Sequence, residues 1–108
     1  MSRFEVFYSS NQFWFRFKAK NGEQILSSEG YLSKQSCLNG INSVKSQAPF
    51  DSSYRRIDGH LNYRFNMVGR NYEIIARSSE GYTTAYNRDH AIEVVKTNAP
   101  SAPVYDLT

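Results

Sequence analysis

The sequence predicts an α+β protein made of two tandem copies of one β-β-β-α unit, related by a pseudo-two-fold axis. Residues Ser27–Tyr31, Ser-Ser-Glu-Gly-Tyr, return as Ser78–Tyr82 after a shift of 51 positions. Before this motif in the chain, the two copies align with a shift of 50 positions, so that Phe15 aligns with Phe65. Two units are too few for an open solenoid, so closure about a two-fold axis is expected.

The change of shift means that repeat two has one extra residue. We place it between Ile75 and Ser78 and interpret it as a β-bulge or a longer strand end. We divide the chain into residues 1–52 (β-β-β-α) and residues 53–108 (β-β-β-α-β). Each half, at just over 50 residues, is marginal for a hydrophobic core of its own, so the halves are expected to form a single integrated domain.

Three strands are expected in repeat one, at residues 3–8, 13–19 and 23–28. The first is aromatic and β-branched and ends at a Ser-Ser-Asn turn. The second has phenylalanine at alternate positions, as a strand with one buried face requires. Asn21-Gly22 follows, and both residue types tolerate positive φ, so the second and third strands form a hairpin.

A helix is expected next, because the apolar period changes from two to between three and four. Its apolar stripe consists of Cys37, Ile41, Val44 and Ala48. Ser33 or Ser36 can cap its start, and Pro49 ends it, since proline disfavours helical geometry in the preceding residue. Cys37 on this stripe is expected to be a packed core thiol rather than a nucleophile.

Repeat two follows the same plan and adds a C-terminal strand. Its expected elements are a strand from Tyr54, strands at 62–68 and 72–77, a helix capped by Thr84 or Asn87 and ended by Pro100, and a short strand at 103–107.

Composition limits the class of protein. The net charge is +3, and the excess lies in residues 1–50, with six Lys/Arg against three Asp/Glu. This excess is small for a dedicated nucleic-acid binder. There is no apolar run long enough to span a membrane and no secretory signal, so a cytoplasmic location is expected. The single cysteine can form no internal disulfide.

Several segments of repeat one carry a family resemblance: Phe15–Glu23, Ser28–Tyr31, Ser33-Lys34, Leu38–Ile41, Val44-Lys45 and Ala48-Pro49. In them the chain resembles the YegP-like, UPF0339-type family of uncharacterised bacterial tandem-repeat proteins. The resemblance implies two β(3)-α-β units that form one antiparallel sheet, with both helices on one face and the last strands exchanged between repeats. It implies no activity, catalytic residue or ligand. One departure, Tyr72 in place of the hairpin glycine, weakens the expectation of a tight second turn.

The repeated motif has a structural and a functional interpretation. It comprises Ser28, Glu29, Gly30 and Tyr31 in repeat one and Ser79, Glu80, Gly81 and Tyr82 in repeat two. In the structural interpretation, which we favour, the glycine turns the chain and the tyrosine packs beneath the helix. In the functional one, each glutamate and its tyrosine form one of two symmetric sites for a cation or a basic peptide.

The polar face of the second strand is the other candidate surface. Trp14, Arg16 and Lys18 alternate with the phenylalanines and therefore share the face that the helices leave open. An aromatic residue beside two cations suits single-stranded nucleic acid, and Trp and Arg also anchor protein interfaces. Ordinary cross-strand pairs on a half-exposed sheet explain the same residues without a partner.

The expected function is a non-catalytic protein-interaction or self-associating module with no cofactor. A weak single-stranded nucleic-acid binder is the second hypothesis, and a small-molecule binder or enzyme is the third. No nucleophile elbow, P-loop or dinucleotide fingerprint occurs, and the two histidines and the cysteine have no metal-ligand spacing. A protein partner is favoured, a membrane is not expected, and the chain is a monomer with pseudo-dimer symmetry or a weak homodimer.

Overall fold

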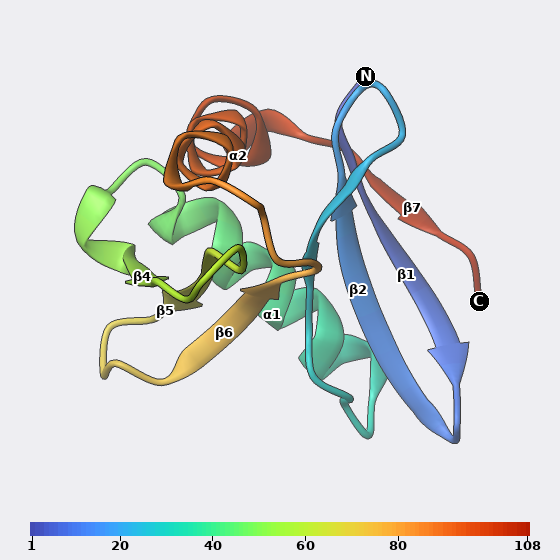
Figure 1. Cartoon of the computed structure of the whole chain (residues 1–108). Helices are drawn as coiled ribbons and strands as arrows, with labels where there is room; N and C mark the ends of the chain where they lie inside the picture. Colours follow the sequence, from blue (N-terminus) through green and yellow to red (C-terminus); the bar gives the residue numbers. More distant parts are fainter.

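The structure, a computed structural model, describes all residues from 1 to 108 and confirms the α+β class with two tandem repeats (Figure 1). The strands are β1 (Arg3–Ser9), β2 (Gln12–Lys18), β3 (Gln24–Ser27), β4 (Tyr54–Ile57), β5 (Arg64–Val68), β6 (Ile74–Ser78) and β7 (Val104–Asp106). The helices are α1 (Lys34–Gln47) and α2 (Ala85–Asn98), each followed by a short 3₁₀ turn, η1 (Asp51–Ser53) and η2 (Ala99–Ser101). Neither helix has the length and apolar composition that a membrane-spanning helix needs.

All seven strands form one sheet in the order β4-β5-β6-β3-β2-β1-β7. Five of the six neighbouring strand pairs are antiparallel, but β7 lies parallel to β1, so the sheet is mixed rather than purely antiparallel. A strand that returns to the sheet after a crossover helix can enter in the parallel direction, and β7 does so beside the start of β1, where the Phe4 N–H donates to the Pro103 carbonyl.

The exchange of last strands between repeats occurs in one direction only. In Figure 1, β7 leaves α2 and lies at the outer edge of β1, on the far side of the sheet from β4. The chain after α1 has no equivalent strand, because η1 leads directly into β4, the first strand of repeat two. The reciprocal exchange that the family resemblance implied is therefore absent.

The pseudo-two-fold axis passes through the middle of the sheet, where β3 pairs with β6. Ser27 of β3 is the direct partner of Arg77 of β6. These two residues are 50 positions apart, the same shift that relates the upstream parts of the repeats. A residue that pairs with its own counterpart lies on the symmetry axis, so the two repeats are halves of one continuous sheet.

The extra residue of repeat two lies after Ser78, not between Ile75 and Ser78 as the sequence suggested. The Ser28 hydroxyl accepts a hydrogen bond from the Phe15 N–H at 2.9 Å, and the Ser78 hydroxyl accepts one from the Phe65 N–H at 3.2 Å. Ser28 is therefore the structural counterpart of the first serine of the second motif, not of the second. A register shift occurs at equivalent places in both hairpins and does not account for the insertion.

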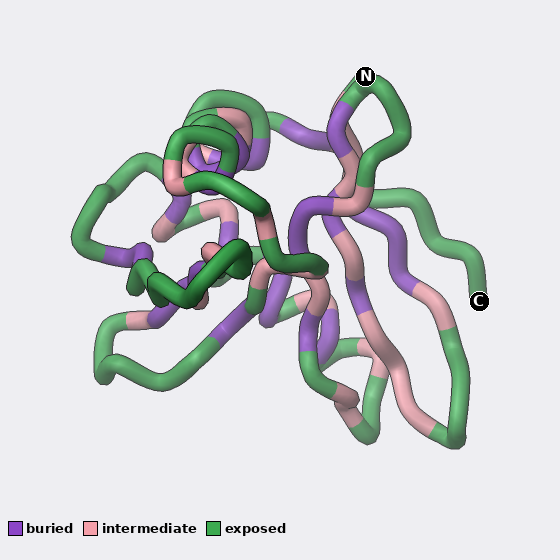
Figure 2. Tube along the Cα trace, in the orientation of Figure 1, coloured by how far each residue is buried: buried purple, intermediate pink, exposed green.

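Both helices pack on the face of the sheet that carries Phe15, Phe17 and Phe65, and together with it they form one hydrophobic core. Figure 2 shows the buried residues gathered where strands and helices meet, with exposed residues at the turns and chain ends. The largest fully buried side chains come from both repeats: Phe4, Phe15, Phe17, Leu26, Ile41, Phe65, Met67 and Ile92. The core is thus shared between the repeats.

The helices begin at the first of the two candidate caps in each case. The Ser33 side chain accepts a hydrogen bond from the Ser36 N–H at 3.1 Å, and Thr84 accepts one from the Asn87 N–H at 3.0 Å. Each bond satisfies one of the N–H groups that have no partner in the first turn of a helix. The two helices have the same length and equivalent caps, as a duplicated unit requires.

The second hairpin turn is tight, although a tyrosine occupies the glycine position. Tyr72 adopts φ 64° and Gly22, its counterpart, φ 86°. The hydrogen bonds are also the same: the N–H of Gly69 donates to the Glu73 carbonyl at 2.9 Å, as Ala19 does to Glu23 in repeat one. Tyr72 weakened the expectation of a tight turn in the sequence, but the turn of repeat two is as tight as that of repeat one.

We expect Tyr72→Gly to stabilise the protein by about 1 kcal/mol, because a residue with a Cβ atom is strained in the left-handed region and glycine is not. Gly22→Ala is the matched control at the equivalent turn and should destabilise by a similar amount. Urea unfolding midpoints measure both changes. A destabilised Tyr72→Gly protein would show instead that the stacking of Arg55 on the Tyr72 ring, 5.6 Å from its centroid, outweighs the backbone strain.

Candidate functional site

The side chains of Trp14, Arg16 and Lys18 lie on the face of the sheet that the helices leave uncovered, which we call the open face. They occupy alternate positions of β2, and the intervening Phe15 and Phe17 are buried in the core. The open face of repeat one therefore has the composition that the alternation in the sequence predicts.

Each of these three side chains has a partner within the protein. The Arg16 Nε donates to Glu5 Oε1 at 2.7 Å, and Lys18 Nζ lies 3.5 Å from the same oxygen. The Trp14 Nε1 donates to the Ser9 carbonyl at 2.8 Å. Arg16 also lies over the ring of Phe7, 4.5 Å from its centroid. These contacts position the three side chains and leave them only partly accessible.

Glu5 is the central residue of this cluster, although no pattern in the sequence marks it as a site residue. It is only 5% exposed although it points to the open face, because Arg3, Arg16 and Lys18 surround it. Burial alone would raise the pKa of its carboxyl group, but hydrogen bonds from Arg16 and Arg3 and the charge of Lys18 lower it to about 2. Three cations thus share one ionised carboxylate, and the cluster keeps a net positive charge.

The open face extends across both repeats. A row of directly paired residues crosses it from β7 to β4: Tyr105, Glu5, Arg16, Ser27, Arg77, Asn66 and Arg55. Arg3, Lys18 and Arg64 flank this row, two positions along their strands. The face therefore carries six of the thirteen Lys and Arg side chains of the chain and one of its ten carboxylates.

The three arginines of repeat two on this face are exposed and form no ion pair. Arg55, Arg64 and Arg77 lie on three neighbouring strands, β4, β5 and β6. Counted along the sequence, the positive excess lies in the first half of the chain. The pairing of β3 with β6 instead brings cations of both halves onto one surface.

The repeated motif has structural roles for its serines and glycines. The Ser28 and Ser78 hydroxyls bond the neighbouring strand, as described above, and the Ser79 hydroxyl accepts a hydrogen bond from Gln24 Nε2 at 3.0 Å. A Cβ atom at Gly30 would collide with the side chain of Gln12, and one at Gly81 with that of Asn62. Side chains at these two positions would therefore displace their neighbours.

The glutamates and tyrosines of the motif lie beside small cavities. The Tyr31 ring stacks on Phe15, with centroids 6.3 Å apart, and packs beneath α1, where Gly40 leaves room for it. Glu29 and Tyr31 line one cavity, and Glu80 and Tyr82 line another. The tyrosine positions agree with the structural interpretation, and each glutamate and its tyrosine also contribute to the wall of a cavity.

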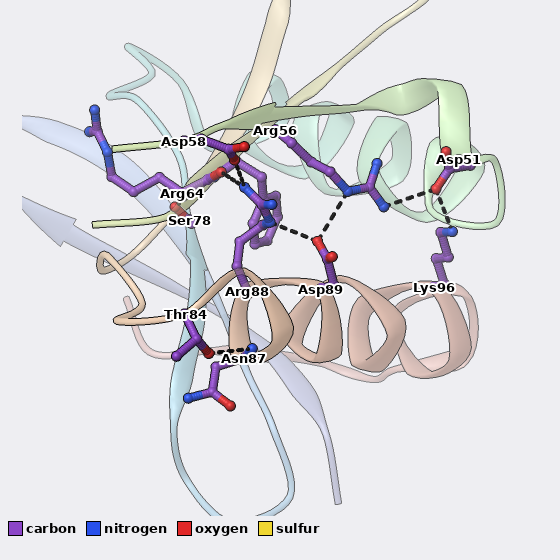
Figure 3. Close-up of polar contacts among 11 residues, drawn as sticks. Asp51, Arg56, Asp58, Arg64, Ser78, Thr84, Asn87, Arg88, Asp89 and Lys96 are labelled. Atoms are coloured by element: carbon purple, nitrogen blue, oxygen red, sulfur yellow. Dashed lines mark hydrogen bonds and ion pairs between the residues drawn. The ribbon is translucent and has the colours of Figure 1, made fainter. Parts of the chain in front are cut away.

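An ion-pair network joins α2 to the start of repeat two (Figure 3). Its members alternate in charge: Lys96, Asp51, Arg56, Asp89, Arg88 and Asp58. Arg88 is only 3% exposed and also donates to the Arg64 carbonyl at 3.2 Å. It stands where repeat one has Cys37. The sequence pattern does not reveal this network, because the pairs that connect α2 to the segment around β4 join residues 30 to 45 positions apart, which meet only in the folded chain.

The remaining titratable candidates are buried or isolated. Cys37 is fully buried, and burial raises the pKa of its thiol to about 11, so the thiol is a poor nucleophile at neutral pH. No three His, Cys, Asp or Glu side chains converge as a metal site requires.

We expect Arg88→Met to lower the free energy of unfolding by about 2–3 kcal/mol, because it removes a buried cation and leaves the Arg64 carbonyl without its donor. Both aspartate partners are about half exposed or more and can be hydrated, which limits the loss. Arg56→Met, in a more exposed part of the same network, is the control and should cost less than about 1 kcal/mol. Equal losses in thermal or urea unfolding would contradict a special role for Arg88.

Glu5 should make the protein sensitive to acid. Its folded pKa of about 2 lies below the ordinary value of 4.5, so its stabilising effect is complete above about pH 4.5 and is lost as the pH falls toward 2. At neutral pH we expect Glu5→Gln to cost about 3 kcal/mol. Unfolding curves from neutral to acidic pH should converge for the two proteins. A constant difference across that range would contradict the assignment, and Glu93→Gln, at an exposed ion pair, is the neutral control.

Sequence and structure comparisons place this fold among known proteins. The sequence pattern of DUF1508, a domain of unknown function, matches the chain twice, at residues 9–54 and 61–106. The UPF0339 protein in the ptx operon 5'region of Stutzerimonas stutzeri is 42% identical over 106 residues, which cover 96% of this chain and 95% of that protein. The UPF0339 protein YegP of Escherichia coli K12 is 44% identical over 101 residues, covering 93% of this chain and 91% of that protein.

Solved structures of two such proteins have the same fold. The solution NMR structure of UPF0339 protein SO3888 from Shewanella oneidensis superposes with a TM-score of 0.92, at 37% identity, over 99% of this chain and 92% of that chain. The solution NMR structure of YegP from E. coli, a protein of unknown function, gives a TM-score of 0.89 at 43% identity, over 99% and 93% of the two chains. Two matches to one domain, close relatives along nearly the whole chain and a shared fold show that this chain belongs to the DUF1508 family.

Proposed function

We propose that this protein is a non-catalytic binding module that docks an acidic protein surface on the open face of its sheet. The observation that supports this proposal is the charge of that face, where six cations of both repeats meet a single carboxylate. The chain has a net charge of only +3, so the rest of the molecule carries a net negative charge. A surface this unlike the remainder of the protein attracts a partner of opposite charge and orients it.

The type of cation favours a carboxylate-rich partner. Five of the six side chains are arginines, and the planar guanidinium group binds a carboxylate through two parallel hydrogen bonds. Arg55, Arg64 and Arg77 are exposed and have no internal ion pair, so they are free to make such bonds. Arg16 and Lys18 are held by Glu5 and add to the positive field rather than to direct contacts.

The aromatic residues favour a protein over single-stranded nucleic acid. Nucleic-acid binding to a sheet relies on exposed rings, on which each stacked base contributes about 1–3 kcal/mol. Here Arg16 covers the Phe7 ring, and the Trp14 indole is half-buried and bonded to the Ser9 carbonyl. Tyr105, the exposed aromatic residue at the edge of this face, has Arg3 over its ring, 5.8 Å from the centroid. The rings of the face are thus partly buried or already in contact with arginines, which favours a charged protein partner over stacked bases.

The test is an NMR titration that follows amide chemical shifts while an acidic probe is added at low and at physiological salt. We expect poly-L-glutamate to shift residues of β4, β5 and β6 on the open face, with binding weakened by salt. In Arg64→Gln/Arg77→Ser the affinity should fall about tenfold, since two exposed charges are removed. Serine at position 77 is tolerable because Ser27 occupies the equivalent position.

Lys20→Gln/Arg70→Gln is the matched control, because it removes the same charge from two exposed turn positions away from the open face. Its affinity should remain close to that of the wild type. An equal loss of affinity in both variants would show that binding depends on net charge alone and would overturn the proposed surface. Tighter binding of a single-stranded oligonucleotide than of poly-L-glutamate of matched charge would overturn the choice of an acidic protein as partner.

A further inference from the structure

The repeated motif lines two small cavities that neither the core nor the open face accounts for. The first, which we call the Tyr31 pocket, has a volume of about 220 Å³ and lies beside α1. Its walls include Glu29 and Tyr31 of repeat one and Glu73 of repeat two. A single pocket thus contains carboxylates from both repeats.

The second cavity, the Tyr82 pocket, is the pseudo-two-fold counterpart of the first. It has a volume of about 280 Å³ and is lined by Glu80 and Tyr82 of repeat two and by Glu23 of repeat one. The helix walls also correspond, with Asn39 in the Tyr31 pocket and His90 in the Tyr82 pocket. The same combination of two glutamates and a tyrosine therefore occurs twice, each time completed by the opposite repeat.

The four glutamates of these pockets are the only carboxylates of the chain without an ion-pair partner. Each of the other six forms at least one ion pair: Glu5, Asp51, Asp58, Asp89, Glu93 and Asp106. The chain has thirteen cationic side chains, so a shortage of partners is not the reason. The fold leaves two uncompensated negative charges at each pocket.

The tyrosines of the two pockets experience this charge. Burial and then the charges of Glu23 and Glu80 raise the pKa of Tyr82 to about 12. Burial raises the pKa of Tyr31 as well, and the charges of Glu29 and Glu73 contribute in the same direction. The hydroxyl group of Tyr82 is also buried without a hydrogen-bond partner, which is uncommon for a buried polar group. Both carboxylates of each pocket thus raise the pKa of the same tyrosine, which lines the pocket with them.

We propose that each of the two pockets binds one organic cation, an alkylammonium or guanidinium group held by its two glutamates against the tyrosine ring. Carboxylates accept strong hydrogen bonds from such groups, and an aromatic ring attracts a cation. Pockets for drug-sized ligands measure about 300–1,000 Å³, so cavities of this size suit one group no larger than a lysine or arginine side chain. The source is either a free amine or such a side chain of a protein.

The test uses NMR titration with n-butylamine, n-butylguanidine and a short peptide that contains one lysine and one arginine, and n-butanol serves as the uncharged probe. Amide shifts of Gly30 and Gly81 report on the Tyr31 and Tyr82 pockets, respectively. We expect saturable shifts at both glycines with the cationic probes only. In Glu23→Gln/Glu80→Gln the binding at Gly81 should weaken about tenfold or more while that at Gly30 is retained.

Glu29→Gln/Glu73→Gln is the reciprocal variant, and each double variant is the folding control for the other. Tighter binding of the peptide would identify a protein side chain as the source of the cation, and equal or tighter binding of the free amines would identify a small molecule. The proposal is overturned by the absence of saturable shifts with every cationic probe, by equal shifts with n-butanol, or by shifts that both double variants leave unchanged. Because these probes are cations, the result is independent of the polyanion titration of the open face.

Discussion

Pairing between β3 and β6 at the centre of the sheet joins the two repeats and allows them to share one core. Without it, each of these strands would be an exposed edge with unsatisfied backbone groups, and each repeat would have only half of the core. With it, Ser27 lies beside its own counterpart, Arg77, and the two repeats become one sheet. The helices then cover one face of that sheet together, and β7 of repeat two can reach the edge of repeat one.

The same pairing separates charge across the molecule. Directly paired residues of neighbouring strands project to the same side of a sheet, so the cations of both repeats are collected on the open face. The hairpin of each repeat is brought next to the motif of the other, which places Glu23 near Glu80 and Glu73 near Glu29. One surface is therefore cationic, and two pockets beside the helices are anionic, in a chain of modest net charge.

The two repeats keep one backbone plan while their side chains diverge. Gly22 and Tyr72 occupy the same turn, although only the glycine is free of strain there. A buried thiol, Cys37, has as its counterpart a buried arginine, Arg88, whose charge is balanced by Asp89 of α2 and by Asp58, which follows β4. Backbone hydrogen bonds and apolar burial define the unit, so individual positions have been able to change chemistry.

Local patterns determined much of the fold from the sequence alone: the alternation of Phe15 and Phe17, the hairpin turn at Gly22 and the apolar stripes of both helices. These features depend on residues a few positions apart, for which period and turn chemistry are sufficient. Three features emerge only in the folded chain: Glu5 forms ion pairs with Arg16 and Lys18, Arg77 joins them on one face, and β7 enters parallel to β1. Such partners depend on the register and order of strands that are distant in sequence. A one-residue change of register exchanges the two faces of a strand. The composition of the candidate sites therefore depends on how the strands pair, which the sequence of each strand does not specify.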